Sequence, residues 1–481
     1  MSGLQRQSRF ERGEDVVVMK FGGTSVEDAT AIRRLIDIVK SRLGSHPVLV
    51  VSALAKVTDQ LLEAGHAATA GHLGSALATV RNLYVRHEQL ADSLVDGAAY
   101  NSLERELRAG IQALETLLQD LCSSREFSSQ VKDHLLGFGE YLSSRLVSEA
   151  LRQAGIDASH IDARECIVTD SRHGQASPLW EVTNERLRDV LSPLLSQGSV
   201  PVLGGFIASS ADGVPTTLGR GGSDFSAAIA GAALGASRIE IWTDVDGIMT
   251  TDPRLCPDAQ VIRKMSFDEA AELAHFGAKV LHPATLSPAV RENIPVYVLN
   301  SRRPEEAGTE ITARAKNGRT VSAITAKRNV AAVQIESPSG IDAALLDAVF
   351  GAFDKHGSPV DVMATSLGRI SLLVSSADAL PAIAADLQSV ANVSWENHKA
   401  LVCLVGENIR RQPEVASRVF AAVADLGARV FCQGPSERTI SFLVEETQVE
   451  ESVQRLHALF FPKHEPDRDW GGMSTAFCHA G

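Results

Sequence analysis

Two glycine-rich segments of the chain each combine small residues with a single cation, a combination suited to binding phosphate. The first is Lys20-Phe21-Gly22-Gly23-Thr24-Ser25, and the second is Gly219-Arg220-Gly221-Gly222-Ser223-Asp224. Glycine lets the backbone approach a ligand closely, and successive N–H groups then surround an anion. A lone Gly-Gly pair is more often a simple strand-to-helix turn, and Arg220 could be a solvated side chain. In the second segment, three glycines beside one arginine and one aspartate favour anion binding.

Phosphoryl transfer suits this combination, because its catalysis consists mostly of positioning and charge neutralisation. The sequence contains no Ser–His–Asp signature, metal-ligand cluster or Walker A loop, and no G-x-G-x-x-G after an expected strand. A carboxylate acceptor is already ionised at pH 7 and needs no general base. Its repulsion from a nucleotide is about 4 kcal/mol for two charges ~4 Å apart at an effective dielectric of ~20. Lys20, Arg220, Lys279 and a Mg²⁺ ion would offset this repulsion.

Both segments are expected where a strand meets a helix. An apolar run at 16–19 precedes Lys20, helical spacing follows from 31 to 39, and 48–51 is a second apolar run. This order begins a βαβ unit, so we expect a parallel sheet covered by helices. Residues of about 58 to 155 have helical spacing. Further strands are predicted at 199–203, 239–242 and 294–299.

The surroundings of the second segment predict a closely packed helix. Residues 225–235 include many alanines and glycines, whose small size allows tight packing, and Ser223 and Asp224 suit the N-cap and the first turn. Trp242-Thr243-Asp244 ends a predicted strand, where open α/β sheets bind ligands, although by itself it is more often a structural turn. Glu140 lies in a stretch with helical spacing and could be a surface carboxylate. His282 is more often a packing or cap residue than a catalyst.

The C-terminal part of the chain contains an internal repeat. Residues 301–320 are polar and charged, which indicates a linker or an edge segment. Beyond them, Val349-Phe350 matches Val419-Phe420, and Ile370-Ser371 matches Ile440-Ser441, at a constant offset of 70 residues. Each copy has the pattern strand, helix, strand, strand, helix, strand. The repeat therefore predicts two ferredoxin-like βαββαβ domains.

The composition of the chain excludes several classes of protein. Of its 481 residues 44% are hydrophobic, and 46 Lys and Arg against 59 Asp and Glu give a net charge of −13. An acidic chain is a poor candidate for sequence-independent nucleic-acid binding. The six cysteines are scattered, which argues against a disulfide scaffold or zinc ribbon and favours a reducing cytoplasm. No apolar run reaches the ~18 residues of a membrane span, and residues 1–14 lack a secretory signal.

Taken in order, these motifs resemble the aspartokinases of the amino-acid kinase superfamily, which carry two C-terminal ACT domains. The resemblance also rests on Phe276-Gly277-Ala278-Lys279-Val280-Leu281-His282-Pro283 and spans about residues 15–462. It implies an α/β protein whose catalytic domain, 15–300, is an amino-acid-kinase sandwich with a central, largely parallel sheet. A linker at 301–320 and tandem ACT domains at 321–462 follow, the first at about 337–395 and the second at about 321–336 plus 396–462. Residues 1–14 and 463–481 are then tails.

The family implies ATP-dependent phosphorylation of the L-aspartate β-carboxylate to 4-phospho-L-aspartate, the first step towards lysine, threonine and methionine. Lys20 would stabilise the transferring phosphoryl group and Asp224 would orient Lys20. Arg220 would hold the substrate α-carboxylate and Glu140 its α-ammonium, with Ser52, Thr58 and Ser223 nearby. ATP, with Mg²⁺, would be held by Lys20, Gly22, Gly23, Thr24, Gly222, Thr243, Asp244, Met249, Arg254, Lys279 and Val280, and no separate protein metal site is expected.

The family also implies an amino-acid effector, lysine or threonine, at the ACT domains. The candidate effector residues are Val360, Asp361, Met363, Thr365 and Ser366. Leu367 stands where lysine-sensitive relatives usually have a glutamate, so we expect weak or absent inhibition by lysine. Met249 and Ala208 stand where the family often has an aromatic residue and a glycine. A homodimer or homotetramer joined through ACT strands is expected, without nucleic-acid or membrane partners.

Two alternatives stay open at this point. One is a related amino-acid kinase that acts on another carboxylate, against which Glu140 and Thr58 argue weakly. The other is a non-catalytic amino-acid sensor built on an inactive kinase. The presence of both Lys20 and Asp224 argues against the sensor, because an inactive kinase would be expected to lose these residues first.

Overall fold

The computed structural model describes residues 15–277, 283–315, 318–338, 340–366, 368–432 and 436–462. The chain divides into two compact units. The first contains the described residues up to Met249 and those of Val261–Arg319, and the second contains Thr250–Gln260 and the described residues from Thr320 onward. The segment Thr250–Gln260 is therefore built into the second unit, although the sequence on both sides of it belongs to the first.

The first unit is built on an eight-stranded sheet in the order β3-β5-β2-β1-β8-β10-β11-β9. All neighbouring strands are parallel except β10 and β11. The strands are β1 (Val17–Phe21), β2 (Pro47–Val51), β3 (Ala158–Ile161), β5 (Val200–Gly204), β8 (Arg238–Thr243), β9 (Lys264–Ser266), β10 (Val296–Asn300) and β11 (Thr309–Thr312). The predicted largely parallel sheet is confirmed, and each predicted strand lies within two residues of its position in the structure.

The central strands are apolar along their whole length because helices cover both faces of the sheet. Every residue of β2 is buried, and in β1 only Lys20 is partly exposed. Val17, Met19 and Phe21 share one hydrophobic core with helices α1 to α5, so the alternating residues face the other side, where α8 packs against β1 and β8. A Cβ at Gly231 would lie only 2.8 Å from Ile239 Cδ1, so glycine lets α8 approach the sheet closely.

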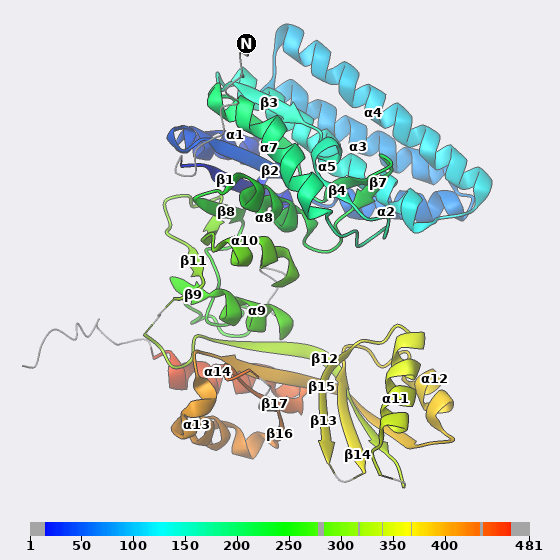
Figure 1. The fold of residues 1–481 in the computed structure, drawn as a ribbon, viewed down its shortest axis with the longest axis vertical. Coiled ribbons are helices and arrows are strands. Elements are labelled where there is room, and N and C mark those ends of the chain that lie inside the picture. Colours follow the sequence, from blue (N-terminus) through cyan, green and yellow to red (C-terminus); the bar gives the residue numbers. More distant parts are fainter. Residues whose placement is uncertain are drawn as a thin grey trace, which may run out of the picture. The chain divides into compact units, whose positions relative to one another are not determined.

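The predicted helical region is a group of long helices that packs on this sheet (Figure 1). Its members are α2 (Val57–Thr69), α3 (Leu73–Leu94), α4 (Gly97–Ser124) and α5 (Ser129–Gln153), and α1 (Ala29–Lys40), which was predicted separately, shares their hydrophobic core. The remaining elements of the unit are α6 (Ala163–Cys166), β4 (Val168–Thr169), α7 (Trp180–Ser196), β6 (Ile207–Ser210), β7 (Pro215–Thr217), α8 (Gly222–Leu234), α9 (Phe267–His275) and α10 (Ser287–Glu292). A small second sheet has the order β4-β6-β7. Among the described residues, no helix is both long and apolar enough to cross a membrane.

The second unit has one antiparallel sheet of six strands in the order β13-β14-β12-β15-β17-β16. Its elements are β12 (Ala323–Glu336), α11 (Ala343–Lys355), β13 (Val360–Ser366), β14 (Arg369–Val374), α12 (Leu380–Leu387), β15 (Asn392–Val405), α13 (Pro413–Val423), β16 (Arg429–Cys432), β17 (Thr439–Glu445) and α14 (Val449–Phe460). Each half of the sheet has its own hydrophobic core, so the two ferredoxin-like copies predicted from the repeat are present.

The two copies share their longest strands. β12 and β15 have 14 residues each, and they pair with each other from one copy into the other. The first copy therefore includes the part of β12 from Val330 onward. The predicted boundary at about residue 337 leaves this part of the strand out of the first copy. Residues 301–320, predicted as a linker or an edge segment, contain a strand of the first unit, because β11 within them pairs with β10 and β9.

Candidate active site

Loops from four parallel strands meet at the carboxyl edge of the central sheet. β1 ends at Phe21, which lies opposite Val51 at the end of β2 and Trp242 near the end of β8. Val51 in turn lies opposite Gly204, the last residue of β5. The carboxyl ends of parallel strands are where open α/β sheets bind their ligands, so this edge is where a site is expected.

A cavity of about 270 Å³ lies at this edge. The residues that line it are Lys20, Ser52, Thr58, Glu140, Phe206, Gly219, Gly221, Gly222, Ser223 and Asp224. The two glycine-rich segments, which are far apart in the sequence, therefore share one cavity. Phe206 was not among the predicted site residues, although it follows the strand end at Gly204 and could have been found from that position.

Lys20 and Asp224 form an ion pair inside this cavity. The Lys20 Nζ lies 2.7 Å from Asp224 Oδ1, and the two side chains are 12% and 13% exposed. Lys20 lies within β1 and not after it as predicted, because pairing with β2 and β8 continues to Phe21. Asp224 lies in the first turn of α8, where the helix dipole stabilises a negative charge. The pair directs the ammonium group towards the cavity.

The first glycine segment approaches its neighbours closely. The Gly22 N–H donates to the Trp242 carbonyl oxygen at 3.1 Å, so the predicted use of this N–H for a phosphate is contradicted by its internal bond. A Cβ at Gly23 would lie 3.0 Å from the Ala53 carbonyl oxygen, which only glycine tolerates easily. Within the described residues, the N–H groups of Gly23 and Thr24 have no backbone or side-chain acceptor.

The second glycine segment forms the N-terminus of α8. Gly219 and Gly221 have φ of 75° and 72°, a left-handed conformation that favours glycine. Because Gly221 makes this turn, α8 begins at Gly222, and the predicted N-cap role of Ser223 is wrong. Ser223 instead lines the cavity. Arg220 is exposed, does not line the cavity, and makes no ion pair within the described part of the chain.

Glu140 is not the surface carboxylate that its helical position allowed. Its side chain, on α5, lines the cavity, and the residue is only 4% exposed. Burial raises the pKa of this carboxyl from 4.5 to about 7, although the Ala53 N–H and the Lys20 charge oppose the shift. Among the described residues its Oε2 has no hydrogen-bond partner. A buried acid with an unused oxygen is well suited to receive a cationic ligand.

The end of β8 lies beside the Lys20 loop. Ser25 and Ser301 share a hydrogen bond of 2.8 Å, and Ser301 Oγ donates to the Thr243 carbonyl oxygen at 3.0 Å. Asp244 is exposed there. The neighbouring Asp246 is held by Asn300 Nδ2 at 2.6 Å and by an ion pair with Arg303.

Met249 and Arg254, which were also predicted to bind ATP, do not line the cavity. Met249 is partly buried and bridges to Val261 in the first unit. Arg254 belongs to the second unit, where its guanidinium lies 2.6 Å from Asp252. Lys279 and Val280 lie outside the described residues.

The predicted effector residues lie on β13 of the second unit. Asp361 already has partners, because Lys327 Nζ lies 2.6 Å from its Oδ1 and Ser375 Oγ donates to its Oδ2 at 2.8 Å. Val360 and Met363 pack against the core of the first copy, and Thr365 and Ser366 are exposed. Leu367 lies outside the described residues.

Comparisons with known proteins agree with this architecture. The model of the amino acid kinase family matches residues 15–300, and a model of the ACT domain matches residues 402–460. Lysine-sensitive aspartokinase 3 of Escherichia coli is 35% identical over 461 residues, which cover 93% of this chain and 99% of that protein. The chain belongs to the aspartokinases. Aspartokinase 2, chloroplastic, of Arabidopsis thaliana is 33% identical over 471 residues, covering 92% of this aspartokinase and 84% of that protein.

Two solved structures extend the likeness to three dimensions. Escherichia coli aspartokinase III in complex with aspartate and ADP matches this aspartokinase with a TM-score of 0.81 at 35% identity, over 93% of this chain and 100% of that chain. The same enzyme in complex with lysine and aspartate matches with a TM-score of 0.79, and the match covers 93% of this chain and 99% of that chain. This aspartokinase is therefore an enzyme, a kinase with ACT domains.

Proposed function

We propose that this aspartokinase transfers the terminal phosphoryl group of ATP to the β-carboxylate of L-aspartate, which gives 4-phospho-L-aspartate and ADP. The observation that carries the proposal is the single cavity in which the Lys20–Asp224 pair, the buried Glu140 and the N-terminus of α8 meet. The relative solved with aspartate and ADP supports the identity of the two ligands.

Glu140 binds the α-ammonium group of aspartate in this proposal. Its carboxylate is buried and its Oε2 has no partner among the described residues, so a bound cation supplies the charge compensation that the protein leaves out. Arg220 binds the α-carboxylate, since its exposed guanidinium has no ion pair within the described residues and is free to reach over the cavity. Ser52, Thr58 and Ser223 supply hydroxyl groups to the same cavity.

Lys20 stabilises the charge that develops during transfer. A β-carboxylate oxygen attacks the terminal phosphorus while the bond from that phosphorus to the ADP oxygen breaks. No general base is required because the carboxylate is already ionised. Asp224 holds the Lys20 ammonium at 2.7 Å, and the N–H groups of Gly23 and Thr24 are available to the phosphates.

The nucleotide occupies the side of the edge formed by the end of β8. Thr243 and Asp244 lie there, and Met249 follows them in the first unit. In the described ranges, no group of three or more His, Cys, Asp or Glu side chains is arranged to hold a metal ion. Mg²⁺ usually takes phosphate oxygens, waters and one or two carboxylates as ligands, so exposed Asp244 suits an ion bound mainly by ATP. Such an ion would neutralise phosphate charge.

The ACT domains bind a regulatory amino acid at β13 in this proposal. Asp361 is the acidic candidate for an effector ammonium, but Lys327 already neutralises it. We therefore expect lysine to be a weak effector. β13 and β16 are the edge strands of the sheet and can pair with a second copy of the chain, which supports a homodimer or homotetramer.

An acyl-phosphate trapping assay tests the reaction. The chain is incubated with ATP, Mg²⁺ and hydroxylamine, which converts an acyl phosphate to a hydroxamate, together with aspartate, glutamate or acetate. We expect the hydroxamate with aspartate, much less with glutamate, and none with acetate, which lacks the ammonium that Glu140 binds. Equal product from glutamate would indicate a kinase for another carboxylate. No product with any acid would indicate a sensor without catalysis.

A further inference from the structure

Asp133 is a buried carboxylate that no step proposed above uses. It lies on α5 and is 2% exposed. It precedes Glu140 by seven residues, which is two helical turns, so both side chains lie on the same side of the helix. Sequence reasoning missed Asp133, although a second acidic residue in register with Glu140 is a signal that could have found it.

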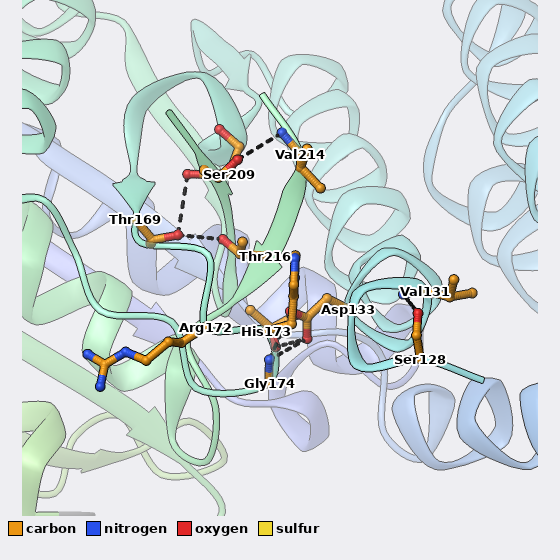
Figure 2. Close-up of polar contacts among 12 residues, drawn as sticks. Ser128, Val131, Asp133, Thr169, Arg172, His173, Gly174, Ser209, Val214 and Thr216 are labelled. Atoms are coloured by element: carbon orange, nitrogen blue, oxygen red, sulfur yellow. Dashed lines mark hydrogen bonds and ion pairs between the residues drawn. The ribbon is translucent and has the colours of Figure 1, made fainter. Parts of the chain in front are cut away.

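Four hydrogen bonds hold Asp133, from two different segments, and Figure 2 shows Asp133 beside His173 and Gly174 of the first segment. In the loop 170–178, the Gly174 N–H donates to Oδ1 at 3.1 Å and to Oδ2 at 2.9 Å, and His173 Nδ1 lies 3.0 Å from Oδ2. Thr217 Oγ1, at the end of β7, donates to Oδ1 at 2.5 Å. His173 Nδ1 is the donor in this contact when the Asp133 carboxyl is ionised, because an ionised carboxylate only accepts hydrogen bonds.

These contacts bear directly on the second glycine segment. Thr217 is two residues before Gly219, which lines the cavity. The Gly174 carbonyl oxygen lies 3.0 Å from the place where a Cβ on Gly219 would be, and the Ala176 N–H donates to the Thr217 carbonyl oxygen at 3.0 Å. The loop 170–178 therefore supports the entrance to the glycine segment, and Asp133 joins both to the helix that carries Glu140.

We propose that Asp133 is a positioning residue for the aspartate end of the cavity. Its carboxylate fixes the start of the glycine segment 219–222, and with it Arg220, at a set distance from Glu140 on the same helix. The two groups assigned to the charged ends of aspartate are thereby aligned with each other. The inference rests on the proposed function, because it names what orients the groups assigned to aspartate binding.

The alternative is that the hydrogen bonds of Asp133 only stabilise the fold. Thr217 and its neighbour Thr216 allow a matched comparison, since both are threonines of β7 and are 2% and 1% exposed. The Thr216 Oγ1 bonds to Thr169 Oγ1 at 2.7 Å and not to Asp133 (Figure 2). Thr217→Val and Thr216→Val therefore make the same chemical change at adjacent buried positions, and only the first removes a bond to Asp133.

Steady-state kinetics of the full chain in the hydroxamate assay test the proposal. We expect Thr217→Val to raise KM for aspartate by about tenfold, because a hydrogen bond to a charged acceptor is lost, while kcat and KM for ATP change by less than about twofold. Thr216→Val should leave KM for aspartate within about twofold of wild type, and Thr217→Ser should restore it. Asp133→Asn should also raise KM for aspartate, and melting curves identify variants that fail to fold.

Two outcomes would overturn the proposal. One is an equal effect of Thr217→Val and Thr216→Val, and the other is a failure of Thr217→Ser to restore KM. A wild-type chain that phosphorylates a different carboxylate would overturn the proposed substrate, and the same four variants tested with that acid would still decide the role of Asp133. A wild-type chain without any activity would overturn both.

Discussion

The Lys20–Asp224 pair places a positive charge in the cavity, where it can interact with the phosphate groups of a bound nucleotide. Both side chains are largely buried, so the carboxylate holds the ammonium in place before any phosphate arrives. A preorganised cation needs little rearrangement as negative charge develops, which is the main source of catalysis in such sites. We therefore expect the ion pair to contribute more to the rate of phosphoryl transfer than to the free energy of unfolding.

Lys20→Met tests this role at the level of one residue. The variant keeps an apolar chain of similar length but loses the charge, so we expect kcat to fall by about 100-fold or more while the protein stays folded. Lys40→Met, at the exposed end of α1, is the matched control and should change kcat by less than about twofold. Near-normal turnover of the Lys20 variant, measured by hydroxamate formation, would refute the role.

Glu140 gives a pH dependence with a definite sign. Its pKa is raised to about 7 by burial, so below pH 7 the free enzyme holds a neutral acid that cannot pair with an ammonium. We expect kcat/KM for aspartate to fall about tenfold per pH unit below this pKa. Glu140→Gln should be slow and lack this limb, whereas Glu149→Gln on the same helix should keep it. A wild-type profile that stays flat from pH 8 to about pH 5 would contradict the assignment.

The same shift makes Glu140 a burden on stability. Because the folded protein binds the proton more tightly than the unfolded chain, the free energy of unfolding falls as pH rises from 4.5 to about 7. Glu140→Gln should therefore melt at a higher temperature than wild type at pH 8, with little difference at pH 4. Differential scanning calorimetry at both values measures this, and an unchanged difference between the two pH values would disagree with it.

Residue type alone selected several residues that the structure brings into one cavity, while contacts that depend on distant partners could not be predicted from the sequence. Lys20, Glu140 and Asp224 carry charges that a phosphoryl-transfer site needs, and all three line the cavity. The Gly22 N–H was misjudged because its acceptor, the Trp242 carbonyl oxygen, is brought to it only by strand pairing. The network around Asp133 was missed for the same reason.

At the scale of elements, apolar runs located the strands well because helices cover both faces of the parallel sheet. The capping rule placed the start of α8 too late, since the left-handed Gly221 is the N-cap and the helix begins at Gly222, before Ser223. The repeat offset predicted both ferredoxin-like copies. It could not indicate that β12 and β15 serve both copies, because Lys327-Arg328-Asn329 and Glu396-Asn397-His398 interrupt the apolar pattern of these strands of 14 residues.

The effector response is a prediction about the whole molecule. The ammonium group of Lys327 already pairs with the Asp361 carboxylate. A free lysine that binds at Asp361 must therefore compete with this ion pair. We expect lysine to change the reaction rate little in the wild type. Lys327→Met should increase lysine inhibition several-fold by freeing Asp361. Lys355→Met, which breaks a more exposed pair with Asp386 in the ACT copy that contains Asp361, is the control and should not.

Activity titrated against lysine, threonine and methionine measures this response. Strong inhibition of the wild type by low concentrations of lysine would show that neither the Lys327–Asp361 pair nor Leu367 limits the effector site. Inhibition by threonine alone would support an effector site in the ACT domains and would identify threonine as its ligand.

The path of the segment Thr250–Gln260 limits how the two halves of the gene can be exchanged. Cys256 packs in the core of the second ACT copy, and Thr250 Oγ1 lies 2.9 Å from His457 Nε2 on α14. Recombination at one breakpoint near residue 320 would join a foreign regulatory half to eleven residues selected for a different core. A functional chimera would therefore have to exchange both Thr250–Gln260 and the ACT domains. This requirement makes it harder to exchange the kinase and ACT domains separately than their order along the chain suggests.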